Sequence, residues 1–229
     1  MEKIKHLYVL IHPFYSAPGG ASNAPASWYL THEESLLKHW KDVIDRVRSD
    51  PGAALYIEPQ LQTKWPAEDT IPKGASADFE RKLFEYARHR LGSRAFFEVT
   101  QLRKHVNRST KQFAFGEYFH ACVSDNSVKL AKFVGMDPKK IHPMPDLSVI
   151  LHGSREKGEL PRIITPDHWK DLSLEERKAI VEENLGKTEQ VYSRKLRQLL
   201  ERNSRESQHR IDVLRGFSLL SKPKPKHKP

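Results

Sequence analysis

The sequence contains one cysteine, Cys122, among its 229 residues. A single thiol excludes an intramolecular disulfide and any zinc site built from several cysteines. The chain also lacks an apolar run of the roughly 18 residues that a transmembrane helix needs. Its N-terminus lacks the long apolar stretch and the small-residue cleavage site of a secretory signal. These absences predict a protein of the reducing cytoplasm that has no membrane partner.

Hydrophobic residues are scarce for a compact globule, at 38% of the chain, whereas charged residues reach 30%. Much of the shortfall lies near the C-terminus, and the length fits one ordinary domain with an appendage. We therefore expect an α/β domain over residues 1–165 and a helical extension over residues 166–220. Residues 221–229 are rich in Lys and Pro and are expected to form a disordered basic tail. The helices of the extension are candidates for contact with a protein partner or a second copy of the chain.

The net charge of +10 is concentrated in two parts of the chain. Residues 101–150 contain 8 Lys and Arg against 4 Asp and Glu, and residues 201–229 contain 8 against 3. A basic surface attracts polyanions over a Debye length of about 8 Å. Contact with nucleic acid or another polyanion is one explanation of this charge, and solubility is the other.

Apolar runs and helical stripes alternate along the first 165 residues. Residues 5–12 and 53–58 are apolar runs followed by a proline, which is typical of buried parallel strands. Between them, a capping box at Thr31 and Glu34 predicts the start of a helix. The predicted strands span residues 5–12, 53–58, 95–100, 116–123 and 147–152. This alternation predicts a three-layer, Rossmann-like α/β fold, with helices on both faces of a mostly parallel, five-stranded sheet.

In such a sheet, ligands bind outside the carboxyl ends of the strands. That rule selects a small set of positions as places where a site would be built. They are residues 12–16, Glu58, and residues 100–104, 122–126 and 152–154.

The segment from Gly116 to Val123 reads GEYFHACV, and a helical stripe follows it and ends at Gly135. This pattern resembles the nucleophile segment of the isochorismatase-like cysteine hydrolases, in which Cys-Val leads from a strand into a helix. The first strand and the Pro-Gly-Gly loop after it resemble that family's opening segment in layout. The resemblance implies that Cys122 attacks a small amide or ester-like substrate without a cofactor. A helix N-terminus beside the sulfur would lower the thiol pKa, because unpaired amides favour the thiolate.

Two positions differ from the family's pattern. The family's general base is an aspartate at the end of the first strand, whereas this chain has His12 there. An imidazole can perform the same proton transfer. The family's catalytic lysine follows the third strand, and Lys104 lies in that neighbourhood without a matching motif. The candidate site residues are Cys122, His12 and Lys104 for catalysis, and His120, Asn126 and Glu58 for substrate binding.

Other interpretations of these residues remain open. A cysteine beside a valine at the end of a buried strand is also typical of a small core residue. His120 shares a strand face with Cys122 and either polarises the thiol or is a core histidine. Together with His12 and His152, it would supply the three ligands of a catalytic zinc. No close-spaced pair such as His-x-His supports that zinc, so we predict no metal site.

A basic segment at residues 101–112 is the second candidate site. Arg103, Lys104, Arg108 and Lys111 would neutralise phosphates. Nearby aromatic residues would stack on bases if they are exposed. Those residues are Phe113, Phe115, Tyr118 and Phe119. The alternative is that the aromatic side chains enter the core and the basic loop is only solvated.

Two functions from different classes therefore remain. The first is an isochorismatase-like hydrolase, active or degenerate, that acts on a small molecule through Cys122. The second is a noncatalytic protein that binds RNA or DNA through the basic loop and the C-terminal tail.

Overall fold

The computed structural model describes residues 3–14, 26–58, 75–117, 122–152, 162–185 and 194–198. Its strands are β1 (His6–Ile11), β2 (Ala53–Glu58), β3 (Ala95–Phe96), β4 (Lys111–Gly116), β5 (Ile141–Pro143), β6 (Ile150–His152) and β7 (Arg162–Ile164). Its α-helices are α1 (Ala26–Arg48), α2 (Ala75–Leu91), α3 (Val99–Leu102), α4 (Ser124–Val134), α5 (Pro166–Asp171) and α6 (Leu174–Leu185). Short 3₁₀ turns include η1 (Gly92–Arg94), η3 (Pro138–Lys140) and η4 (Pro145–Leu147).

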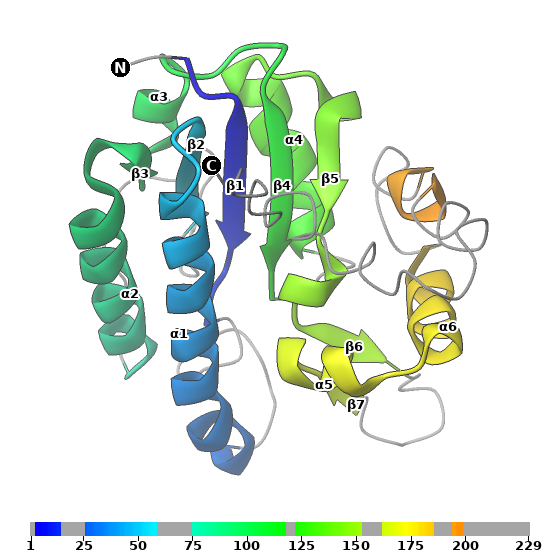
Figure 1. Cartoon of the computed structure of the whole chain (residues 1–229). Coiled ribbons are helices and arrows are strands. Elements are labelled where there is room, and N and C mark those ends of the chain that lie inside the picture. Colours follow the sequence, from blue (N-terminus) through cyan, green and yellow to red (C-terminus); the bar gives the residue numbers. More distant parts are fainter. Residues whose placement is uncertain are drawn as a thin grey trace, which may run out of the picture.

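Five of the described strands form one parallel sheet, in the order β3-β2-β1-β4-β5. The chain moves outward from β1 through β2 to β3, and then returns to place β4 on the other side of β1. The direction of winding therefore reverses between β1 and β4, which is the topological switch point of such a sheet. Figure 1 shows α1 and α2 on one face of the sheet and α4 on the other. This confirms the three-layer, Rossmann-like α/β fold.

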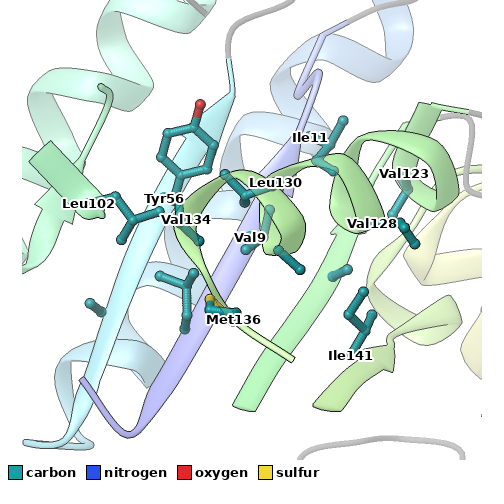
Figure 2. Close-up of a cluster of buried hydrophobic side chains, with 14 of the residues drawn as sticks. Val9, Ile11, Tyr56, Leu102, Val123, Val128, Leu130, Val134, Met136 and Ile141 are labelled. Atoms are coloured by element: carbon teal, nitrogen blue, oxygen red, sulfur yellow. The ribbon is translucent and has the colours of Figure 1, made fainter. Parts of the chain in front are cut away.

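The two faces of the sheet carry separate hydrophobic cores. Successive side chains of a strand point to opposite faces, and β1 follows this rule. Leu7, Val9 and Ile11 are buried with the residues of α4, whereas Tyr8 and Leu10 are buried with those of α1 and α2. Figure 2 shows the first of these cores, in which the apolar side chains of α4 lie over β1. Burial on both faces explains why β1 reads as a continuous apolar run.

The fourth strand differs from the sequence-based prediction. It spans Lys111–Gly116, whereas residues 116–123 were predicted. Gly116 ends the strand with φ +141°, and a Cβ there would lie 2.0 Å from the carbonyl oxygen of Ile11. Only glycine tolerates that conformation and that close approach. Cys122 accordingly lies in the helical turn before α4 and not in a strand.

The third and fifth strands also differ from the prediction. The third is limited to Ala95–Phe96, because Val99 already begins α3. The fifth strand of the parallel sheet is β5, which contains Pro143 and has no long apolar run. The predicted strand at 147–152 contributes β6 instead, which pairs antiparallel with β7. Figure 1 places this pair and α5 beyond the carboxyl ends of β1 and β4.

The described part of the predicted helical extension packs on the α/β core. Trp169 of α5, Ile180 and Val181 of α6, and Leu196 belong to the same buried cluster as Val9. These apolar residues of the extension therefore join the core that lies on the α4 side of the sheet. The boundary at residue 165 stays a prediction, and the predicted tail at 221–229 lies outside the described residues. None of the described helices is both long and apolar enough to span a membrane.

Candidate functional site at the carboxyl edge of the sheet

The carboxyl ends of three neighbouring strands meet at the switch point. Ile11, the last residue of β1, is in register with Glu58 of β2 and with Gly116 of β4. The backbone continues this alignment, because the His12 N–H donates to the Glu58 carbonyl oxygen at 3.0 Å. On the other side, the Glu117 N–H donates to the carbonyl oxygen of Ile11 at 3.2 Å. These bonds hold His12, Glu58 and Glu117 at one edge.

Asn126, in the first turn of α4, joins two of these residues. Its Nδ2 atom donates to Oε1 of Glu58 at 3.2 Å and lies 3.4 Å from Nε2 of His12. When the His12 ring is neutral with its proton on Nδ1, Nε2 accepts the second amide hydrogen. The structure therefore brings three sequence-predicted residues, from β1, β2 and α4, into one hydrogen-bonded group.

Burial sets the protonation of this group. Glu58 is 1% exposed, and burial raises its pKa to about 8, although Lys129 opposes this shift. Burial also lowers the pKa of His12 to about 4. Both side chains are therefore mainly uncharged near neutral pH, because burial disfavours the charged form of either group. Among the described residues, Oε2 of Glu58 has no hydrogen-bond partner.

His12 has a strained backbone as well as a buried side chain. Its φ of +49° places it in the left-handed region, which costs roughly 1–2 kcal/mol for a residue with a Cβ. Such strain is concentrated at functional sites, where the surrounding structure holds it in place. Here the turn directs the chain away from β1 at the point where the site is built.

Cys122 lies four residues before Asn126 and is half-buried. Burial raises the pKa of its thiol to about 11, and the charges of Asp125, Glu58 and Glu117 raise it further. The prediction of a lowered thiol pKa at the helix N-terminus is therefore wrong. The physical reason is first that burial disfavours the thiolate, and second that carboxylates from β2, from the end of β4 and from α4 itself oppose negative charge on sulfur. Any nucleophilic role for Cys122 requires a base that removes its proton.

Lys104 lies at the opposite edge of the sheet. The carbonyl oxygen of His105 accepts the N–H of Ile4, and the Lys111 N–H donates to the carbonyl oxygen of Lys5. Residues 103–111 thus contact the amino ends of β1 and β4. The six residues of β1 separate that edge from His12 by roughly 20 Å. The structure does not bring Lys104 to Cys122, because the chain turns back through α3 directly after the short β3.

The basic segment forms an exposed surface at this amino edge. The side chains of Arg103, Lys104, Arg108 and Lys111 are all exposed, and no acidic residue occurs between positions 99 and 116. Lys140 extends the surface, since its Nζ donates to the Ser109 carbonyl oxygen at 3.4 Å.

The aromatic residues near this surface belong mostly to the core. Phe115 is fully buried, and Phe113 stacks on Tyr8 with ring centroids 5.0 Å apart. Neither ring is free to stack on a base. Tyr118 and Phe119 lie outside the described residues. The amino edge therefore offers cations for phosphates, but these two described aromatic rings do not add a stacking platform.

The remaining predictions have mixed outcomes. His120 lies outside the described residues, as does the side chain of His152. Within the described residues, no group of three His, Cys, Asp or Glu is placed to hold a metal ion. Glu117, which is 1% exposed, was missed as a site residue. The misplaced fourth strand hid it, although a carboxyl directly after a strand-ending glycine is the signal that would have identified it.

A cleft of about 470 Å³ lies elsewhere, between α1 and the segment formed by η4 and α5. Its lining includes Lys38, His39, Arg46, Asp146 and Trp169. None of the carboxyl-edge residues lines it, so it is separate from the group around Asn126.

Comparison with known proteins adds no relative. No protein-family model, curated protein or solved structure matches the chain.

Proposed function

We propose that this chain hydrolyses a small amide or ester through Cys122 at the carboxyl edge of the sheet. The observation that supports this most is the hydrogen-bonded group of His12, Glu58 and Asn126, in which Asn126 of α4 follows Cys122 by four residues. Its position at the switch point is where doubly wound sheets bind their ligands. The resemblance of residues 116–135 to the isochorismatase-like nucleophile segment supports the same chemistry.

The reaction has two steps. The Cys122 sulfur attacks the substrate's carbonyl carbon, and the thiol proton passes to a base. The C–N or C–O bond then breaks, the leaving group takes a proton, and a thioester remains on Cys122. Water attacks the thioester, releases the acid product and restores the thiol.

The charges near Cys122 favour a neutral or cationic substrate. Asp125, Glu117 and, once it is ionised, Glu58 oppose negative charge on its sulfur. An anionic group bound beside that sulfur would meet the same repulsion. We therefore expect iodoacetamide, which is neutral, to modify Cys122 faster than iodoacetate, its anionic analogue. The ratio of the two rates should exceed the ratio for the same reagents with a free thiol.

Hydrolysis of p-nitrophenyl acetate, a small neutral ester, tests the proposal. We expect the full chain to release p-nitrophenol faster than Cys122→Ala, with a rate that saturates as the ester concentration rises. Circular dichroism confirms that the variant is folded. Equal rates for the two folded proteins would refute the proposal.

The exposed cations of the amino edge favour a second function, binding of nucleic acid. Arg108 and Lys111 are exposed there, and Lys140 extends the same surface. Each phosphate contact contributes about 0.7 to the slope of log affinity against log salt for a single strand. Arg108→Gln/Lys111→Gln should thus reduce the slope for a labelled single-stranded RNA by about 1.4. Lys38→Gln/Lys82→Gln, which removes two exposed cations from α1 and α2, is the matched control. Unchanged binding by the first variant would refute this function.

A further inference from the structure

The acceptor of the Cys122 proton is not the aspartate that the family's pattern predicts. In the isochorismatase-like pattern an aspartate follows the first strand, and this chain has His12 there. The buried imidazole has its pKa lowered to about 4, whereas that of the Cys122 thiol is about 11. A proton transfer from sulfur to His12 is therefore strongly unfavourable, because burial disfavours the charged imidazole. A group with a higher pKa would be a better acceptor.

Glu58 is positioned for that role. It ends β2 and pairs in register with Ile11, so its backbone lies beside that of His12. Asn126 holds one carboxyl oxygen, Oε1, while the buried Oε2 atom has no hydrogen-bond partner among the described residues. Asn126 donates to Glu58 from the first turn of α4, four residues after Cys122, which places the carboxyl at the end of α4 where Cys122 lies. A buried carboxyl with one oxygen held and the other unbonded is what a proton acceptor needs.

We propose that Glu58, in its ionised form, accepts the proton of Cys122 as the sulfur attacks, in place of the aspartate that the family carries after the first strand. This inference rests on the proposed hydrolase function. The S–H bond breaks and an O–H bond forms on Glu58, while the sulfur forms its bond to the carbonyl carbon. The carbonyl electron pair moves to oxygen. When the C–N or C–O bond breaks, Glu58 returns the proton to the leaving group and becomes ionised again.

The acidities favour Glu58 over His12. The pKa of Glu58, about 8, lies closer to that of the thiol, about 11, than the pKa of His12 does, about 4, so transfer to Glu58 is the less unfavourable of the two. Transfer to Glu58 also leaves the net charge of the Cys122–Glu58 pair unchanged. Asn126 acts as a positioning residue, because it binds the carboxyl and the imidazole without exchanging a proton.

Glu58→Gln in the full chain tests this assignment with two measurements. The amide keeps the Oε1 acceptor for Asn126 but cannot take a proton. We expect Cys122-dependent hydrolysis of p-nitrophenyl acetate to fall by about 10²-fold or more, as is usual for loss of a general base. Alkylation of Cys122 by iodoacetamide at pH 9 should instead become faster, because the variant removes a negative charge near the sulfur. Opposite changes in the two rates distinguish a base from a residue that only perturbs the thiol.

The outcomes separate this inference from the function on which it rests. Hydrolysis by the original chain that is no faster than by Cys122→Ala would overturn both. Cys122-dependent hydrolysis that survives in Glu58→Gln but is lost in His12→Asn would overturn the role of Glu58 and leave the hydrolase function standing. The pH profile of the unsubstituted chain is a further measurement that needs no folded variant. Its rate should rise about tenfold per pH unit below pH 8 and then level off. A rate that continues to rise tenfold per unit beyond pH 9 would contradict the assignment.

Discussion

Replacement of Glu58 by glutamine should make the protein more stable in alkaline solution. Burial raises the pKa of Glu58 from its ordinary value of 4.5 to about 8. A carboxyl whose pKa is higher in the folded state stabilises the fold fully below the unfolded pKa. That contribution is lost as pH rises toward the folded pKa. The loss therefore develops between pH 4.5 and pH 8, and glutamine, which does not ionise, avoids it.

The size of the effect follows from the pKa difference. One pKa unit corresponds to about 1.36 kcal/mol, so a shift of 3.5, from 4.5 to 8, has a limiting cost of about 5 kcal/mol. Part of that cost is already present at pH 5, and nearly all of it is present at pH 9. The free energy of unfolding should therefore fall between pH 5 and pH 9 by about 4 kcal/mol more in the original chain than in Glu58→Gln. That is a large part of the 5–15 kcal/mol that stabilises a typical domain.

Urea denaturation followed by tryptophan fluorescence measures this difference at each pH. Glu85→Gln, which removes an exposed carboxyl on α2, is the matched control. The free energies of the control and the original chain should differ by the same amount at every pH. If the difference between the original chain and Glu58→Gln changes by less than 1 kcal/mol from pH 5 to pH 9, the argument for a buried protonated carboxyl is refuted.

Three further predictions follow from particular contacts. Gly116→Ala should destabilise the fold by more than 3 kcal/mol, because its Cβ would lie 2.0 Å from the Ile11 carbonyl oxygen; a urea midpoint within error of the original would disprove this. Trp40→Phe should lower the free energy of unfolding by about 2–4 kcal/mol, because the buried indole N–H donates to the Pro13 carbonyl oxygen at 3.0 Å. A calorimetric melting temperature that does not change would argue against that bond. Cys122 should react with iodoacetamide at pH 7 at least tenfold more slowly than free cysteine, since burial and nearby carboxyls raise its pKa to about 11; mass spectrometry that finds equal rates would contradict this.

The parts of the fold with uninterrupted apolar runs could be predicted from the sequence. The predicted bounds of β2, residues 53–58, agree with the structure, because both of its faces are buried. By contrast, β4 begins with the polar pair Lys111 and Gln112, and β5 contains Pro143, so neither has the pattern of a buried strand. Their positions depend on pairing with a neighbour, and a single sequence does not carry that information.

Only part of the candidate site, too, could be predicted from the sequence. His12, Glu58 and Asn126 were found because parallel strands bring their carboxyl ends to one edge. Lys104 was assigned to that edge on the assumption that the third strand runs to residue 100, whereas the chain turns back into α3. The predicted direction of the thiol pKa shift was wrong mainly because the burial of Cys122 depends on the tertiary packing, which the local pattern at residues 116–135 does not show. The carboxylates of Glu58 and Glu117 add to the rise, and the misplaced fourth strand hid Glu117.

Trapping the intermediate tests the central claim most directly. The full chain is mixed with p-nitrophenyl acetate near pH 8, quenched in acid and digested, and its peptides are analysed by mass spectrometry. The proposed reaction predicts an acetyl thioester on Cys122 that forms within the burst of p-nitrophenol and accumulates when its hydrolysis is slow. An unmodified Cys122 throughout a measured burst, with acetyl groups only on other side chains, would contradict it.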